Sequence, residues 1–212
     1  GGDHIVSAKN IYGGTYNLLA HTLVDFGVTT TFVDPFNLEE VEGAIKDNTK
    51  AVYIETLGNP NSEVVDIEAL AEIAHKHKIP LVIDNTFGTP YLIRPIEYGA
   101  DIVVHSATKY LNGHGDVIAG FVVSDAEFIN QVKMFGIKDM TGSVLGPQEA
   151  FLILRGLKTL EIRMQKHCAN AHQVADFLTA CDKVEKVYYP GLESHPNHEV
   201  AARQMKDFGA MI

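Results

Sequence analysis

Three consecutive apolar runs of this sequence each end in polar side chains. The runs are residues 51–54, 80–83 and 101–104. Asn59 follows the first run, Asp84 comes directly after the second, and the third is followed by Ser106, Thr108 and Lys109. In open α/β sheets, ligands bind at the edge where the carboxyl ends of parallel strands meet. If the three runs are such strands, one edge of the sheet gathers an amide, a carboxylate, an amine and two hydroxyls.

The carboxylate and the amine point to one kind of chemistry. Asp84 follows four apolar residues, so it should be partly desolvated, and we expect a positive group beside it. Lys109 stands between hydroxyls and a glycine-rich loop, where an amine can attack a carbonyl. Pyridoxal phosphate uses both groups, because a lysine holds it as an imine and a carboxylate keeps its ring nitrogen protonated. Ser106 and Thr108 would then hydrogen-bond the phosphate.

Strands must position these side chains, and the sequence predicts six. Short apolar runs alternate with segments of helical periodicity up to about residue 123, which is typical of strand–helix units that build a parallel sheet. The predicted strands are residues 4–7, 31–33, 51–54, 80–83, 101–104 and 119–123, and the predicted helices between them are residues 15–26, 38–45 and 67–77. Most runs are apolar without alternation, as strands covered on both faces should be. The predicted fold class is a layered α/β fold.

Helices predominate after residue 123. The predicted elements are helices at residues 125–134, 147–179 and 198–206, a strand at 186–189, and the opening of a further strand at 208–212. This change divides the chain into a large domain, a linker helix that leads away from the sheet, and the start of a smaller domain. The three parts are residues 1–145, 146–180 and 181–212.

The composition excludes several classes of protein. The chain has 212 residues, of which 46% are hydrophobic, so it is not disordered and can bury a sizeable core. Its 17 Lys and Arg residues against 27 Asp and Glu residues give a net charge of −10, which makes nucleic acid and anionic membrane surfaces poor partners. No stretch approaches the roughly 18–20 apolar residues of a membrane span, and the first residues do not form a secretory signal.

Cysteine and histidine usage predicts the compartment and argues against a metal site. Cys168 and Cys181 are interpreted as reduced thiols, which predicts a cytoplasmic location. The histidine pairs at positions 75 and 77 and at positions 195 and 198 lack Cys or carboxylate residues at ligand spacing. We therefore expect no metal.

The residues around Asp84 and Lys109 resemble a known family. Residues 84–86 (Asp-Asn-Thr) and 106–110 (Ser-Ala-Thr-Lys-Tyr) are similar to segments of the fold-type I pyridoxal-phosphate enzymes of Cys/Met metabolism, the γ-lyases and γ-synthases of sulfur amino acids. The similarity extends through residues 11–15, 58–61, 101–105 and 155–160. It implies a three-layer, mainly parallel sheet that forms the cofactor-binding large domain, followed by the start of a smaller α+β domain. Because the family's subunits are longer, it also implies that both domains are incomplete here, the large one at its N-terminus.

The resemblance implies roles for particular residues. The implied cofactor-binding residues are Tyr12, Asn59, Asp84, Thr86, Ser106, Thr108 and Lys109. Lys109 would carry the cofactor and then move protons on the substrate, and Asp84 would pair with the ring nitrogen. Tyr12 would stack on the ring and act as acid toward the leaving group, so these three residues are the implied catalytic set.

The reaction implied by the resemblance is an α,γ-elimination. Residues 136–145 and 164–170 look most like the methionine γ-lyases of the family, which convert L-methionine to methanethiol, 2-oxobutanoate and ammonia. In those enzymes the pair corresponding to Lys138 and Asp139 organises the site near the substrate tail. Gly14 departs from them, because they usually carry Cys there. Glycine is typical of the synthases and sulfhydrylases.

Alternatives therefore stay open. Within the family they are γ-replacement, of the O-acetylhomoserine sulfhydrylase or cystathionine γ-synthase type, and a cystathionine γ-lyase. Outside enzymology, the alternative is a fragment without catalysis. The resemblance implies an amino-acid substrate and a homotetramer, built as a dimer of dimers with shared active sites.

Overall fold

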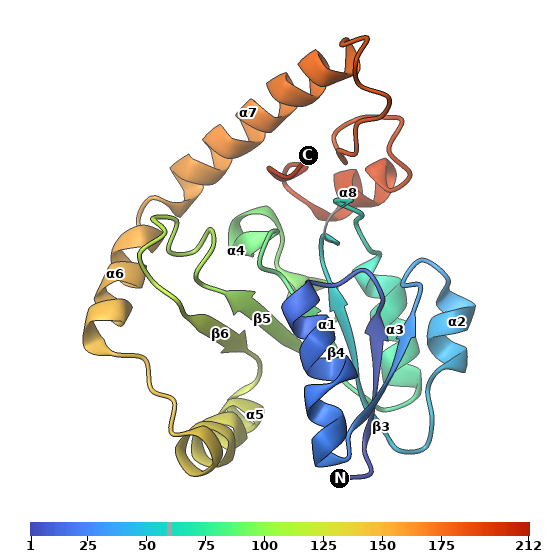
Figure 1. The fold of residues 1–212 in the computed structure, drawn as a ribbon, viewed down its shortest axis with the longest axis vertical. Helices are drawn as coiled ribbons and strands as arrows, with labels where there is room; N and C mark the ends of the chain where they lie inside the picture. The colour runs from blue at the N-terminus through green and yellow to red at the C-terminus, as the bar shows by residue number, and fades with distance from the viewer. Residues whose placement is uncertain (59–60) are drawn as a thin grey trace.

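The computed structural model describes residues 1–58 and 61–212, and these form one six-stranded sheet (Figure 1). The strands are β1 (His4–Ala8), β2 (Thr29–Val33), β3 (Thr49–Glu55), β4 (Leu81–Asp84), β5 (Ile102–Ser106) and β6 (Gly120–Val123). Their order is β2-β1-β3-β4-β5-β6, and all neighbours are parallel except β5 and β6, which are antiparallel. The predicted mainly parallel sheet is confirmed.

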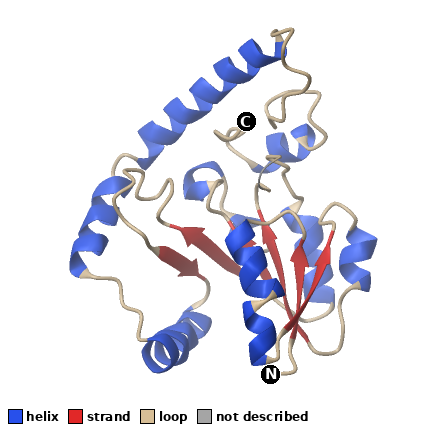
Figure 2. Cartoon of the chain, viewed as in Figure 1, coloured by secondary structure: helices blue, strands red, loops and turns tan. Residues whose placement is uncertain are grey.

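Helices connect the strands and extend beyond them (Figure 2). In the first part of the chain they are α1 (Gly13–Ala20), η1 (Thr22–Phe26), α2 (Leu38–Gly43), α3 (Ile67–Lys76), α4 (Thr89–Leu92) and η2 (Pro95–Tyr98). After β6 they are α5 (Ala126–Gln131), η3 (Val132–Thr141), α6 (Pro147–Leu157), α7 (Leu160–Thr179) and α8 (His198–Gln204). Asn37, Asp66 and Asp125 cap α2, α3 and α5 by accepting a backbone N–H with their side chains.

Two predicted helices are divided in the structure. The segment 15–26 forms α1 and then the 3-10 turn η1, and the segment 147–179 forms α6 and α7 with a break at Lys158 and Thr159. At that break the Thr159 hydroxyl donates to the carbonyl oxygen of Gly156, and the Arg163 guanidinium donates to the same oxygen. Polar groups that bind a helix carbonyl in this way end the regular ladder. The short elements α4 and η2 were not predicted.

The C-terminal part contains no strand among its described residues. Residues 186–189 and 208–212 are irregular, so both strand predictions were wrong. A strand needs a neighbour that takes up its backbone hydrogen bonds, and no described strand lies beside either segment. Instead Gln204 of α8 donates from Nε2 to the Val65 carbonyl at 2.6 Å, and Lys206 N donates to the Leu92 carbonyl at 2.8 Å. The division of the chain at residues 145 and 180 stays a prediction.

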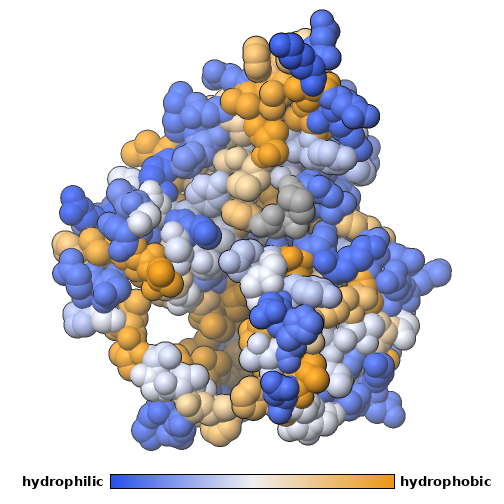
Figure 3. Space-filling view, viewed as in Figure 1, coloured by the Kyte–Doolittle hydropathy of each residue, from blue (hydrophilic) through white to orange (hydrophobic). Residues whose placement is uncertain are grey.

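Large apolar side chains are exposed on the segment from α5 to α6. They include Phe135, Met140, Val144, Leu145, Phe151 and Leu154, of which Val144 is 84% exposed. Figure 3 shows apolar residues around the opening between this segment and the rest of the molecule.

None of the helices in residues 1–58 and 61–212 is both long and apolar enough to cross a membrane.

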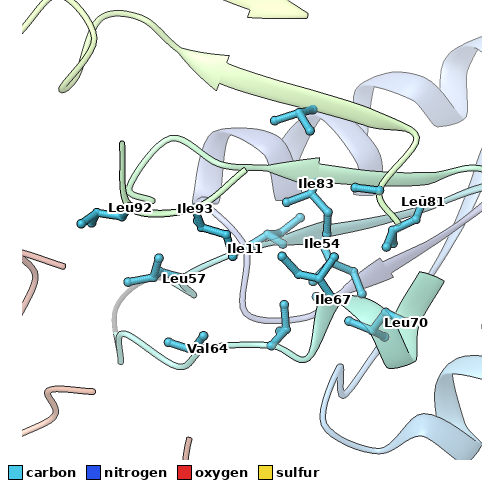
Figure 4. Packing of buried hydrophobic residues seen from close by; sticks show 14 of the residues in the cluster. Ile11, Ile54, Leu57, Val64, Ile67, Leu70, Leu81, Ile83, Leu92 and Ile93 are labelled. Carbon is cyan, nitrogen blue, oxygen red and sulfur yellow. The ribbon is translucent and has the colours of Figure 1, made fainter. Parts of the chain in front are cut away.

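The main hydrophobic core lies between α3 and one face of the sheet. Ile54 of β3 and Ile83 of β4 are fully buried there together with Ile67 and Leu70 of α3 (Figure 4). Successive side chains of a strand point to opposite faces, so the other face carries residues 53 and 55 of β3 and residue 84 of β4. Helix α1 covers that face, where Tyr16 packs on Phe32 with ring centroids 4.5 Å apart. The sheet is thus the middle of three layers.

Candidate active site

The carboxyl ends of β3, β4 and β5 carry polar side chains on the face covered by α1. Glu55 is the register partner of Asp84, and Asp84 is the register partner of Val104, two residues before Ser106. Residues paired in register share a face, as do residues two apart in a strand. Glu55, Asp84 and Ser106 therefore point to the same side.

A cavity of about 280 Å³ opens above this edge. It is lined by Tyr12, Glu55, Leu57, Asp84, Thr86, Phe87, Ser106, Thr108, Lys109 and Ile118. The structure thus brings together six of the seven cofactor-binding residues predicted from the sequence. The seventh, Asn59, lies outside the described residues.

Neutral donors surround the carboxylate of Asp84. The Tyr53 hydroxyl donates to Oδ2 at 3.2 Å, and Thr86 donates to Oδ1 from its backbone N–H at 3.0 Å and from its hydroxyl at 2.5 Å. Burial and the charge of Asp84 raise the pKa of Tyr53, so that phenol keeps its proton and stays a donor. We expected a positive group beside Asp84, but no described Lys, Arg or His nitrogen lies within 4 Å of it.

Thr86 connects the ends of β4 and β5. Its hydroxyl donates to Asp84 and accepts the backbone N–H of Ser106 at 2.8 Å. One hydroxyl thereby fixes the rotamer of the Asp84 carboxylate and the position of Ser106. Ser106 begins the segment 106–113, which carries Lys109 and is called the lysine loop below. Such a chain of hydrogen bonds strengthens each of its members.

Lys109 lies in a tight turn after β5. Its carbonyl accepts the Gly113 N–H at 2.8 Å, and its own N–H donates to the Ser106 carbonyl at 3.2 Å. Arg163 of α7 holds the next residue, because its Nη1 donates to the Tyr110 carbonyl at 2.8 Å. The lysine backbone is thus held from both sides, while Lys109 lines the cavity and has no ion-pair partner within the described part of the chain.

Ser106 and Thr108, the two candidate phosphate ligands, differ in whether their hydroxyls already form hydrogen bonds. Thr108 donates from its hydroxyl to the Ala119 carbonyl at 3.3 Å and accepts the Ala119 N–H at 3.1 Å. The hydroxyl of Ser106 forms no hydrogen bond to any described residue and lines the cavity. A phosphate could therefore be received by Ser106 directly, whereas Thr108 would have to turn its proton away from Ala119.

Tyr12 stands at the N-terminus of α1 with its side chain 59% exposed. Its backbone N–H donates to Oε1 of Glu55 at 2.7 Å. A Cβ atom on Gly14 would lie 2.5 Å from Cε1 of the Tyr12 ring, closer than real contacts allow. Gly14 therefore permits the position that the phenol adopts.

Glu55 is the site residue that sequence reasoning missed. It is 7% exposed, and burial raises the pKa of its carboxyl to about 7, with the charge of Asp84 adding to that rise and the Tyr12 N–H opposing it. The available signal was that Glu55 ends the first apolar run as Asp84 ends the second. Asn59, four residues further along, was predicted in its place.

Lys138 and Asp139 lie outside this cavity. They are on η3, where Lys138 Nζ is 3.4 Å from Asp139 Oδ1 and both side chains are more than half exposed.

The described residues contain no group of three or more His, Cys, Asp or Glu side chains placed to hold a metal ion.

The family model for Cys/Met metabolism PLP-dependent enzymes matches residues 1–212. The chain belongs to this family. The membership names the cofactor, pyridoxal phosphate, that the sequence had suggested. It also agrees with the site, where a carboxylate and a lysine meet at the carboxyl edge of a mainly parallel sheet.

Particular members of the family are similar to this chain over its whole length. The chain is 62% identical over 212 residues to an L-methionine gamma-lyase of Fusobacterium nucleatum subsp. nucleatum, covering 100% of the chain and 54% of the relative. It is 49% identical to a cystathionine beta-lyase of Lactococcus lactis subsp. cremoris, covering 100% of the chain and 55% of the relative. The crystal structure of metB from Corynebacterium glutamicum superposes with a TM-score of 0.94 at 46% identity, covering 99% of the chain and 54% of that structure. The chain therefore spans about half the length of the curated relatives it matches.

Proposed function

We propose that this chain forms the lysine-bearing half of the active site of a lyase that eliminates the γ-substituent of L-methionine. Methionine and water would yield methanethiol, 2-oxobutanoate and ammonia. One observation carries the proposal: Asp84 and Lys109 line the same cavity at the carboxyl edge of the sheet. The greater identity to the methionine lyase of Fusobacterium, 62% against 49% for the cystathionine lyase of Lactococcus, favours this substrate.

The residues present fit the family's cofactor. Asp84 is held only by neutral donors among its described partners, so it is suited to a protonated ring nitrogen. The Ser106 hydroxyl has no hydrogen-bond partner among the described residues and would receive the phosphate, Thr86 would lie on the ring's side of Asp84, and the exposed ring of Tyr12 would be available for stacking. When bound, pyridoxal phosphate supplies a carbonyl for an amine and an electron sink for the pair released at the substrate Cα.

This chain's residues then divide the proton transfers. Lys109, which lines the cavity, would take the proton from the substrate Cα, deliver it to C4′ of the bound cofactor, and, free again as an amine, take one from Cβ. The Tyr12 phenol would deliver a proton to the γ-sulfur as methanethiol leaves. Lys138 and Asp139 would act only on the far end of the substrate, because they do not line the described cavity.

Gly14 favours a second candidate, γ-replacement on an activated homoserine. A Cβ atom on residue 14 would lie 2.5 Å from the Tyr12 ring, so glycine lets the phenol stand close to the backbone here, and glycine at this position is typical of the family's synthases and sulfhydrylases. The two reactions are distinguished by supplying a thiol and asking whether it is incorporated into the amino-acid product.

The test uses the natural full-length protein and its Lys109→Ala variant. Pyridoxal phosphate added to the wild type should produce an absorbance band at about 420 nm, typical of a lysine-bound cofactor, and addition of L-methionine should yield 2-oxobutanoate. The variant should show neither. A band that persists in the variant would contradict the assignment of Lys109, and a band without methionine-dependent 2-oxobutanoate would contradict the lyase reaction.

We also propose a homotetramer of shared active sites in the cytoplasm. The exposed apolar side chains of the α5 to α6 segment support self-association, since single chains rarely expose such patches. The free thiols Cys168 and Cys181 are typical of a reducing compartment. Sedimentation of the full-length protein, which should give four subunits, tests the first part.

A further inference from the structure

Helix α1 begins without the usual local signals. Its N-cap residue, Tyr12, makes no side-chain cap, and its first turn contains no acidic residue. The next two residues are Gly13 and Gly14, which leave the backbone free to take many conformations. The chain around Tyr12 therefore does not by itself determine where the phenol stands.

Glu55 provides what α1 lacks. Its carboxyl accepts the Tyr12 N–H at 2.7 Å and supplies an acceptor at the start of the helix, where the first backbone N–H groups have no partner within the helix. Because Glu55 belongs to the rigid strand β3 and pairs in register with Asp84, the anchor has a defined position relative to the carboxylate of the site.

We propose that Glu55 is a positioning residue for Tyr12, holding the backbone of residue 12 so that the phenol stands over the cavity that Lys109 lines. The inference rests on the proposed function, since it gives Tyr12 a task in that reaction. Glu55 itself need not touch the substrate.

The surroundings of Glu55 suit this role better than a charged one. It faces Asp84 on β4, Tyr53 on its own strand, Tyr12 on α1, and Lys109 across the cavity. Ionising two neighbouring carboxylates costs free energy because like charges repel. The Asp84 carboxylate accepts three hydrogen bonds, whereas that of Glu55 accepts one. Burial raises the pKa of Glu55 to about 7, and the protonated carboxyl still offers Oε1 as an acceptor for the Tyr12 amide.

The test is a double-mutant cycle in the full-length protein with Glu55→Ala and Tyr12→Phe. Glu55→Ala should lower kcat about 10- to 100-fold, as expected when a catalytic group is misplaced by about 1 Å, and change KM less. In the Tyr12→Phe background the same change should cost less than about threefold. Glu55→Gln, whose amide oxygen still accepts, should restore kcat to within about threefold of the wild type.

The controls separate the possible failures. Glu39→Ala, a change at an exposed position in α2, should leave kcat unaltered. If Glu55→Ala does not fold, Glu55→Asp replaces it, because the shorter side chain withdraws the carboxyl from the amide. Equal losses in both backgrounds, or no loss in either, would overturn the role of Glu55 while wild-type turnover still supported the lyase. A wild type without the cofactor band or 2-oxobutanoate would overturn the proposed function instead.

Discussion

Gly156 of α6 packs directly against the lysine loop, and adding one methyl group there should disturb that loop. A Cβ atom at this position would lie 2.1 Å from the carbonyl oxygen of Asn112 and 2.9 Å from its carbonyl carbon. Gly156 is buried, and the neighbour is backbone that cannot rotate away. Gly156→Ala therefore forces α6 and the loop apart by about 1 Å in a close-packed interior.

The free energy of unfolding should fall by about 2 kcal/mol. Overpacking of this kind costs about 1–3 kcal/mol, with the upper end expected against backbone, and the better helix propensity of alanine returns up to about 1 kcal/mol. Gly43→Ala is the matched control, because that glycine is also helical but has nothing within 4 Å of the added atom. It should gain about 0.5–1 kcal/mol.

Urea unfolding of the two variants and the wild type measures the difference. Asn112 N donates to the Ala107 carbonyl and Gly113 N to the Lys109 carbonyl, so a displaced Asn112 should also shift Lys109 and lower turnover about tenfold or more. If Gly156→Ala were as stable as Gly43→Ala, the close approach of α6 to the loop, and its support of Lys109, would be refuted.

Two further predictions concern neighbouring residues. Because the pKa of Glu55 rises from its ordinary 4.5 to about 7 on folding, its contribution to stability is fully present below pH 4.5 and is lost as pH rises through about 7. Unfolding free energies measured across that range should fall by on the order of 3 kcal/mol, and Glu55→Gln should remove this slope; an unchanged slope would assign it to another group. Thr86→Val removes a donor to Asp84 and the acceptor of Ser106 N–H, so the cofactor should bind about 10- to 100-fold more weakly by equilibrium dialysis. Thr86→Ser should keep nearly normal binding, and equal binding by Thr86→Val and the wild type would show that the relay is dispensable.

Much of the fold follows from local patterns. Helix α3 illustrates this: its buried residues Ile67, Leu70, Ala71 and Ala74 recur with helical period, and Asp66 caps it. The strand runs are similarly readable, because burial on both faces demands continuous apolar residues. Asp84 and Lys109 could be found for the same reason, since each follows a strand at the edge where ligands gather.

Elements that depend on distant partners could not be read in this way. Residues 186–189 have the composition of a strand but no described neighbour to bond, and they stay irregular. The break between α6 and α7 depends on Arg163, which also reaches back to Tyr110. Lys138 and Asp139 were predicted to organise the site near the substrate tail, yet on η3 they are exposed and paired with each other.

The sequence by itself determined a mainly parallel sheet and the carboxylate and lysine at its edge, because strand burial and strand ends are local properties of the chain. Only the tertiary structure decided that Glu55 joins them. Its role depends on the register of β3 against β4, its own burial, and the 2.7 Å contact with the Tyr12 amide. These relations join residues that are far apart in the sequence, Glu55 with Asp84 in one case and with Tyr12 in the other, and no local pattern encodes them.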